Sequence, residues 1–376
     1  MHAESRIMTP PKPTSFGRFF LPGPTEVRPE ILAAMNQPMI GHRVTEMEEL
    51  IGRVQPRLRT IFRTERPVYI SASSATGLME GAVRNGARKR VLSLVNGAFS
   101  ARFHQIARAT GLEADALELP WGAAHTPELL RDALARGDYD AVTMVHSETS
   151  TGVLNPVQEL AQVVAGAGDV VTLVDTVSSL AGADFHTDAW GIDFVLTGSQ
   201  KCFALPPGLA FGVAQKRILE RAATKSDRGI YFDFLEFEKN IVKNQTPNTP
   251  AVSLLYALEA QLAAMEAEGL EGRLARHRAL AERTWQWVDE MRERKGIALN
   301  VLAAAPYRSP TVSCITLPDG WTGPRVYAGV KQRGFEIATG YGVMREQTFR
   351  IGHMGDHTLA ELDELLAAIE DVFAGT

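Results

Sequence analysis

Short runs of β-branched and apolar residues alternate with helix-length stretches from Val68 to about residue 222. The runs predict seven strands, at 68–72, 90–95, 114–119, 140–145, 170–174, 194–197 and 209–214. The stretches between and after them predict helices at 76–87, 99–111, 127–136, 157–166 and 215–222. Strands separated by helices need right-handed crossovers, which give a mainly parallel sheet covered on both faces. The pattern therefore predicts an α/β fold with a large, doubly wound, seven-stranded sheet.

The pattern changes near Pro250 to long amphipathic helices. Apolar residues recur at helical spacing over 253–265 and 273–294. Beyond them, strands are expected at 311–317, 335–338 and 348–351, interleaved with helices at 323–333 and 358–373. This arrangement predicts a smaller α+β unit. We expect three parts: an N-terminal arm over residues 1–18, a large unit over 19–264 and a small C-terminal unit over 265–376.

Charge and cysteine content argue against several classes of protein. The chain has 39 Lys and Arg against 44 Asp and Glu, a net charge of −5, so binding to nucleic-acid phosphates is not expected. Two cysteines cannot form a disulfide framework or a four-cysteine zinc site. No apolar stretch approaches the ~18 residues of a membrane span. We therefore expect a cytoplasmic protein that binds neither nucleic acid nor a membrane.

An aspartate and a lysine follow two neighbouring strands of the predicted sheet. Asp175 closes one strand and Lys201 follows the next, at the edge where open α/β sheets bind ligands. A buried lysine loses its proton more readily and becomes a nucleophile for Schiff-base chemistry. An aspartate facing a pyridine nitrogen keeps it protonated, which makes pyridoxal phosphate an electron sink. A solvated turn lysine and a helix-capping aspartate remain the alternative from spacing alone.

Small and hydroxyl-bearing residues open the helix predicted at 76–87. Ser73, Ser74, Ala75, Thr76 and Gly77 lie between this helix and the strand before it. Backbone amides at a helix N-terminus, together with two hydroxyls, could bind a phosphate group. An ordinary Ser/Thr helix cap is the alternative. The sequence contains neither a Gly-x-Gly-x-x-Gly nor a Gly-x4-Gly-Lys-Ser/Thr motif, so a nucleotide site is not predicted.

Three further residues could contact a ligand at the same edge of the sheet. Phe99 follows a strand end and could stack on a planar cofactor, although a core position is the alternative. Thr149 also follows a strand and could contact a cofactor oxygen. Arg350 is a charged residue inside a predicted strand. Its guanidinium fork suits a carboxylate, which it can bind through two hydrogen bonds.

Taken together, these segments resemble the class V aminotransferases of fold type I. The resemblance rests on Gly198-Ser199-Gln200-Lys201, Val174-Asp175-Thr176-Val177-Ser178-Ser179, Glu148-Thr149-Ser150-Thr151-Gly152 and Leu21-Pro22-Gly23-Pro24-Thr25. It runs in order from about residue 19 to the C-terminus, and the nearest group is the alanine–glyoxylate and serine–pyruvate (serine–glyoxylate) aminotransferases. It implies a pyridoxal-phosphate-dependent transaminase that moves an amino group from alanine, serine or a similar amino acid to a 2-oxo acid such as glyoxylate or pyruvate. It also implies ping-pong kinetics and a homodimer with shared active sites.

The resemblance also assigns roles to single residues. Lys201 would carry the cofactor and relay the Cα proton, and Asp175 would pair with the pyridinium. Phe99 would stack on the ring, and Thr149 would contact the region of the ring hydroxyl. The cofactor phosphate would be held by Ser74, Ala75, Thr76 and Gln200, with Thr249 reaching it from the other subunit. Arg350 would bind the substrate carboxylate, and His42 would lie near the neighbouring subunit's site.

Two arginines leave the amino donor open. Arg43 follows His42, and Arg345 lies near Arg350, which adds positive charge that an alanine–glyoxylate pair would not need. Phosphoserine aminotransferases use a His-Arg pair at a comparable place for the substrate phosphate. A phosphoserine or aspartate aminotransferase of the same fold is therefore the alternative. A structural role for Arg43 and Arg345, solvated or bridging a dimer, is the other interpretation.

Other chemistries fit the sequence less well. A pyridoxal phosphate lyase remains open, because the reaction depends on which Cα bond is held perpendicular to the ring. Cysteine desulfurases need a reactive cysteine on a mobile loop, and neither Cys202 nor Cys314 fits that requirement. A zinc hydrolase could use His353 and His357, which have helix-like spacing but lack the glutamate of His-Glu-x-x-His. We expect no metal site.

Overall fold

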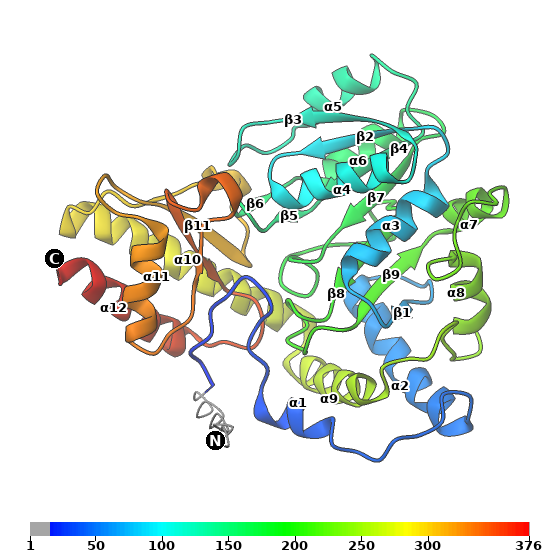
Figure 1. Cartoon of the computed structure of the whole chain (residues 1–376), viewed down its shortest axis with the longest axis horizontal. Coiled ribbons are helices and arrows are strands. Elements are labelled where there is room, and N and C mark those ends of the chain that lie inside the picture. Colours follow the sequence, from blue (N-terminus) through cyan, green and yellow to red (C-terminus); the bar gives the residue numbers. More distant parts are fainter. Residues whose placement is uncertain (1–15, 376) are drawn as a thin grey trace, which may run out of the picture.

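The computed structural model describes residues 16–375, so most of the arm predicted over residues 1–18 lies outside the described residues. A larger and a smaller unit lie side by side (Figure 1), and each has its own sheet and its own cluster of buried apolar side chains. The domain boundaries expected after residues 18 and 264 stay predictions. Within the described residues, no helix is both long and apolar enough to cross a membrane.

The larger unit is built on a sheet with the strand order β1-β9-β8-β7-β4-β2-β3. The strands are β1 (Tyr69–Ser71), β2 (Arg90–Val95), β3 (Glu113–Glu118), β4 (Ala141–Val145), β7 (Val171–Asp175), β8 (Phe194–Gly198) and β9 (Ala210–Ala214). The pairs β2–β3, β2–β4, β4–β7 and β7–β8 are parallel, whereas β9 is antiparallel to both β8 and β1. The prediction of an α/β fold with a large, mainly parallel sheet is confirmed.

Helices cover this sheet because its central strands are apolar on both faces. Every residue of β4, β7, β8 and β9 is buried, as parallel sheets with covered faces require. The helices of this unit are α1 (Pro29–Ala34), α2 (Thr45–Phe62), α3 (Ala75–Gly86), α4 (Ala98–Ala109), α5 (Pro127–Leu134), α6 (Val157–Ala165), α7 (Lys216–Ala223), α8 (Phe234–Ile241) and α9 (Val252–Glu268). A short hairpin of β5 (Ser147–Glu148) and β6 (Val153–Leu154) follows β4.

The smaller unit has a four-stranded sheet in the order β10-β11-β13-β12, packed with three helices. The elements are β10 (Asn300–Val301), β11 (Val312–Thr316), β12 (Ala338–Thr339), β13 (Thr348–Gly352), α10 (Leu270–Lys295), α11 (Gly323–Gln332) and α12 (Leu359–Ala374), with 3-10 turns η1 (Ala305–Tyr307) and η2 (Gly342–Met344). Gly269, at φ +76°, joins α9 directly to α10. Phe20, from the start of the described chain, is buried in the core of this unit.

The elements α1, α8, β5, β6 and β10 were not predicted, and two further departures bear on the packing of the core. The helix α2 was not predicted, although Met47, Leu50, Ile51 and Val54 have helical spacing and are buried in the core. The strand expected at 335–338 is only Ala338–Thr339. The backbone of Glu336 bonds instead to Arg18 and Phe20 of the N-terminal segment, so this stretch pairs with a partner that periodicity alone does not reveal.

Candidate active site

The carboxyl ends of β2, β4, β7 and β8 meet at one pocket of about 350 Å³. Its lining comes from several loops that follow these strands and from the start of two helices: Gly23, Pro24, Ser74, Ala75, Thr76, Met79, Phe99, Arg102, Val145, Ser147, Thr149, Asp175, Val177, Ser178, Gln200, Lys201 and Pro207. Parallel strands bind ligands at this edge because the loops that follow them are free to carry polar side chains. A wider depression between α5 and α6 holds no lysine and no buried acid.

Lys201 lies in the loop after β8, with 7% of the residue exposed. Its Nζ donates a hydrogen bond to the carbonyl of Pro22. Burial, and then the nearby charge of Arg350, lower the pKa of Lys201 to about 8. Gly23 allows this close approach: at φ +95° a side chain is disfavoured, and a Cβ there would overlap the lysine side chain. About a tenth of this amine is therefore neutral at pH 7, far more than for an ordinary lysine.

Asp175 is the last residue of β7, in register with Leu196 of β8, and only 3% of it is exposed. Its Oδ1 accepts a hydrogen bond of 2.6 Å from the amide of Val177. Burial raises the pKa of Asp175 to about 7, since no described residue forms a salt bridge with it. A buried carboxyl that is poised to ionise near neutral pH is suited to meet a cationic group of a ligand.

Hydroxyl and amide donors gather at the N-terminus of α3. Ser74 is the N-cap residue of this helix and its side chain makes no capping hydrogen bond. Ala75 and Thr76 lie in the first turn of the helix. Gln200 lines the same pocket and lies close to Ala75. The amides of a first turn and the positive end of the helix dipole favour an anion. The four residues predicted to hold a phosphate therefore line one pocket.

Phe99 lies in the first turn of α4, and its ring centroid is 5.9 Å from Lys201 Nζ. The helix start is held by Glu148, a fully buried carboxylate that the sequence analysis did not single out. Glu148 accepts hydrogen bonds from the amides of Phe99 and Ser100 and from the hydroxyls of Ser100 and Ser150. Five donors on one carboxylate, counting the amide of Ser150, fix the ring's position in the pocket. Glu148 directly precedes Thr149, and this adjacency is the signal that could have identified it.

Arg350, on β13, lies at the border between the two units. Its Nε donates to the carbonyl of Thr339 and its Nη1 to the carbonyl of Thr149, both at 3.1 Å. The guanidinium lies over the ring of Tyr341, at 5.4 Å, and Tyr341 in turn contacts Phe99. Thr149 lines the pocket, with its hydroxyl bonded to that of Ser178. The strand arginine expected from the sequence is thus next to the pocket, 7% exposed.

Five predicted site residues do not line this pocket: Arg350, which lies next to it, and four that lie elsewhere. Arg43 is exposed and donates hydrogen bonds to the carbonyls of Thr246 and Pro247, and His42 precedes it. Thr249 is exposed on the loop that Arg43 contacts. Arg345 is exposed at the end of η2. Within one chain, the structure brings His42, Arg43 and Thr249 to a common region outside the pocket.

The structure gives other partners to the groups that alternative chemistries would need. His353 bonds through Nε2 to the hydroxyl of Ser313, and His357 bonds to the carbonyl of Phe19. The two histidines lie in a turn, and among residues 16–375 no cluster of three or more potential metal ligands occurs. Cys202 and Cys314 are fully buried, and burial raises their thiol pKa values to about 12 and about 11. Neither thiol is exposed on a loop.

The raised pKa of Asp175 predicts a pH-dependent cost in the ligand-free protein. The unfolded chain loses this proton near its ordinary pKa of 3.8, whereas the folded chain keeps it to about pH 7. Stability therefore falls as the pH rises through this window. Because asparagine does not ionise, Asp175→Asn is expected to raise the free energy of unfolding by about 2–4 kcal/mol at about pH 8 and to change it little below about pH 4. Urea unfolding at both pH values measures this, and an equal effect at both would contradict it.

The sheet, the pocket at its edge and the buried lysine–aspartate pair define a transferase of fold type I. In agreement, a crystal structure of an alanine–glyoxylate aminotransferase from Nostoc sp. superposes with a TM-score of 0.90, at 28% identity over 99% of both chains. Serine–glyoxylate aminotransferase of Methylorubrum extorquens is 33% identical over 93% of this chain and 88% of its own. An uncharacterised aminotransferase of Methanocaldococcus jannaschii is 37% identical over 93% of this chain and 91% of its own.

The family model for class-V aminotransferases matches residues 75–363. The chain therefore belongs to the class-V aminotransferases, and it is a transaminase. The resemblance of its motifs to this family, and the enzyme class that the resemblance implied, are confirmed.

Proposed function

We propose that the pocket holds pyridoxal phosphate. The observation that carries this proposal is the buried pair at the ends of neighbouring strands, Lys201 with its pKa lowered to about 8 and Asp175 with its pKa raised to about 7. Asp175 has no cationic partner in a salt bridge within the described residues, and a protonated pyridine nitrogen would supply one. The pocket volume of about 350 Å³ is in the range of small-molecule sites, and anion-binding groups lie at the N-terminus of α3.

In this proposal each polar side chain has one task. Pyridoxal phosphate supplies, when bound, an electron sink for the pair left at the substrate Cα. Lys201 would hold the cofactor through Nζ, and the same amine, when free, would take the proton from the substrate Cα. Asp175 would keep a proton on the ring nitrogen, and Phe99 would stack on the ring. Thr149 would contact the region of the ring hydroxyl.

The cofactor phosphate would be bound at the start of α3. The hydroxyls of Ser74 and Thr76, the amide of Ala75 and the side chain of Gln200 are the donors, and all four residues line the pocket. The first-turn amides add to these side chains because they point out of the helix start. This arrangement would orient the ring between Phe99 and Asp175.

The substrates we propose are a small amino acid, such as alanine or serine, and a 2-oxo acid, glyoxylate or pyruvate. Support comes from two relatives named above, one for serine and glyoxylate and one for alanine and glyoxylate. Amino donor and acceptor share an α-carboxylate, for which Arg350 is the proposed partner. One site would serve both in turn, so we propose ping-pong kinetics. A phosphoserine donor is less favoured, since these two relatives are named for glyoxylate and not for phosphoserine.

The proposed role of Arg350 predicts a defect in substrate binding. Arg350→Gln removes the charged fork, so kcat/KM is expected to fall about 10- to 100-fold for the amino donor and for the 2-oxo acid alike. Arg325→Gln, an exposed arginine on α11, is the matched control and should leave kcat/KM unchanged. Steady-state kinetics with both substrates measures the change. Equal kcat/KM in the Arg350 variant and the control would contradict this assignment.

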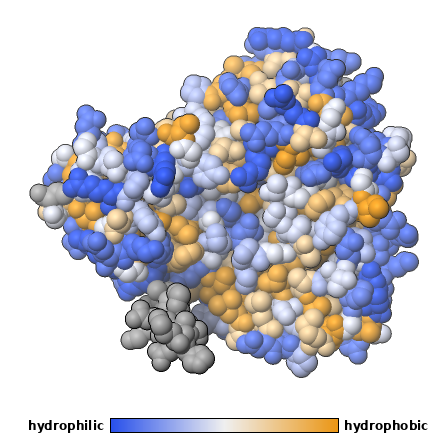
Figure 2. All heavy atoms as spheres, in the orientation of Figure 1, coloured by the Kyte–Doolittle hydropathy of each residue, from blue (hydrophilic) through white to orange (hydrophobic). Residues whose placement is uncertain are grey.

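We further propose a homodimer in which Thr249 and His42 complete the partner's site. Supporting this, apolar side chains gather low on the larger unit, over α1 and α9 (Figure 2). Exposed apolar residues near the loop that carries Thr249 include Met39 at 69%, Val44 at 40% and Tyr231 at 43%. Arg43 ties the segment of Met39 and Val44 to this loop. Thr249 is exposed within its own chain, as a residue that serves the neighbour would be.

A single-turnover screen tests the proposed reaction. Protein loaded with pyridoxal phosphate is mixed with alanine, serine, aspartate, glutamate or phosphoserine, and the visible spectrum is followed. We expect alanine or serine to react fastest and glyoxylate to restore the starting spectrum. If phosphoserine reacts fastest and Arg43→Ala or Arg345→Ala removes that preference, the glyoxylate assignment is wrong. If no amino acid changes the spectrum, the transamination proposed for this pocket is wrong.

A further inference from the structure

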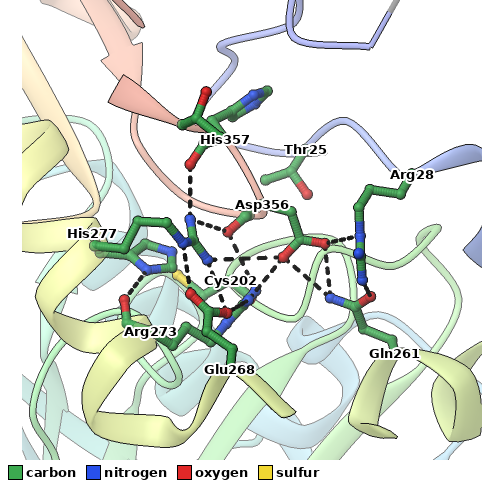
Figure 3. A network of polar contacts seen from close by, with 12 residues as sticks. Thr25, Arg28, Cys202, Gln261, Glu268, Arg273, His277, Asp356 and His357 are labelled. Carbon is green, nitrogen blue, oxygen red and sulfur yellow. Dashed lines mark hydrogen bonds and ion pairs between the residues drawn. The ribbon is translucent and has the colours of Figure 1, made fainter. Parts of the chain in front are cut away.

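A buried arginine on α10 joins the backbone next to Lys201 to the turn that follows β13 (Figure 3). The Arg273 side chain is 2% exposed. Its Nη2 donates to the carbonyl of Cys202 at 2.6 Å, and its Nη1 donates to Asp356 at 2.8 Å and to Glu268 at 2.9 Å. Cys202 directly follows Lys201, so this guanidinium holds the backbone one residue after the lysine.

The partners of Arg273 come from chain segments that each contribute to the pocket. Asp356 lies a few residues after β13, the strand that carries Arg350. Asp356 also accepts a hydrogen bond of 2.9 Å from Arg28. Arg28 ends the N-terminal segment in which Pro22 accepts the hydrogen bond from Lys201 Nζ. One guanidinium–carboxylate pair thus links the lysine loop, the arginine strand and the N-terminal segment.

A second contact ties the same N-terminal segment to the lysine. The hydroxyl of Thr25 donates to the carbonyl of Lys201 at 3.2 Å, and the amide of Thr25 donates to the carbonyl of Gln200 at 3.0 Å. The carbonyls of Gln200, Lys201 and Cys202 are therefore all held from outside the loop. Only the carbonyl of Cys202 is held by a charged group.

The charges of this cluster are costly to bury and are well compensated. Burial opposes the ionisation of Asp356, but Arg273 and Arg28 outweigh it and hold its pKa at about 2. Gln261, itself fully buried, donates to the same carboxylate at 3.0 Å. Apolar side chains of equal volume could fill such a space at no loss of stability, so a buried ion pair by itself is weak evidence for a stabilising role. Its defined geometry can hold three chain segments in one arrangement.

We propose that Arg273 and Asp356 are positioning residues that hold Lys201 in place relative to Arg350. This inference rests on the proposed function, in which the two residues act on the same substrate. Neither residue lines the pocket, and the Nη atoms of Arg273 and the carboxylate of Asp356 are bonded to other protein groups. The pair acts through the carbonyl of Cys202 on one side and through the turn of Gly355 and Asp356 on the other.

Two variants separate positioning from general stability. Arg273→Lys keeps the charge but cannot reach Cys202 and Asp356 together, and Asp356→Asn keeps the shape but removes the charge. The matched control is Arg283→Lys, on the same helix, where the arginine pairs with Asp363 near the surface and does not contact this cluster. Because Asn is isosteric with Asp, Asp356→Asn decides the question alone if Arg273→Lys does not fold.

The first readout needs no catalysis. The cofactor-free full-length protein is treated with acetic anhydride across a pH series, and acetylation of Lys201 is followed by peptide mass spectrometry. The ionisable groups that act on Lys201, namely Arg350, Cys202, Asp175 and Glu148, are unchanged in every variant. Loosening the loop admits water, so the midpoint for Lys201 should rise from about 8 towards its ordinary value by about one pH unit. The second readout is the change in kcat and in KM.

We expect both variants to raise the labelling midpoint and to lower kcat by roughly 10- to 100-fold, because small displacements of reacting groups have effects of this size. KM for the amino donor should rise as well, since Arg350 moves relative to Lys201. Arg283→Lys should change none of these. If the variants only lower the melting temperature and keep the parent labelling curve and kcat, the positioning role is wrong. Failure of the proposed function would appear instead in the parent protein. There, added pyridoxal phosphate would not protect Lys201 from acetylation.

Discussion

Replacing Lys201 by alanine is expected to lower the rate of transamination by at least about 10³-fold, because one amine would then be missing both as the attachment point and as the base. No other lysine lines the pocket, so no described residue can take its place. The amine is buried, its pKa is lowered to about 8, and Gly23 permits the segment that holds it to approach. Single-turnover rates with the preferred amino donor measure the loss.

The control for this variant is Lys331→Ala, an exposed lysine on α11 that pairs with Glu336. It should react at the parent rate. A Lys201→Ala variant that keeps more than about a tenth of the parent rate would be incompatible with proton transfer by this amine, which is a step worth 10²- to 10⁴-fold.

Replacing Asp175 by asparagine is expected to lower kcat by about 10²- to 10³-fold while the variant still binds pyridoxal phosphate. The carboxylate would stabilise the positive charge on the ring nitrogen, and an amide cannot do so. The side chains are nearly isosteric, and Asn can still accept the hydrogen bond that Val177 donates to Asp175. The loss should therefore appear in kcat rather than in folding, and in the ligand-free protein the same variant is expected to be more stable above about pH 7.

Asp193→Asn is the matched control for Asp175→Asn. Asp193 is also a buried aspartate of this sheet, but it bonds to the amide and hydroxyl of Thr172, at the opposite end of β7 from the pocket. Its replacement should lower stability and leave kcat of the folded protein unchanged. Equal kcat values for the two variants would remove the proposed pairing of Asp175 with the ring.

The sequence predicted the residues of the pocket that follow strands directly. Asp175, Lys201, Phe99 and Thr149 each come after an apolar run, and parallel strands bring their carboxyl ends to one edge. Local pattern and sheet topology are enough for such residues. The roles of these residues toward a cofactor came from the family resemblance and not from this pattern.

Residues that act through long-range contacts could not be predicted in this way. Glu148 lies next to a predicted residue, yet its partners are on α4, almost fifty positions earlier in the chain. Arg273 and Asp356 are 83 positions apart, and their charges have no periodic signature. The strand expected at 335–338 pairs largely with the N-terminal segment instead. In each case a contact between distant segments decided the outcome.

The most direct test of the central claim is to locate the cofactor on the chain. The purified protein is incubated with pyridoxal phosphate, reduced with borohydride, digested, and analysed by peptide mass spectrometry. We predict one modified residue, Lys201, together with loss of activity after reduction. A modified lysine elsewhere with Lys201 unmodified, or a protein that takes up no pyridoxal phosphate, would contradict the account.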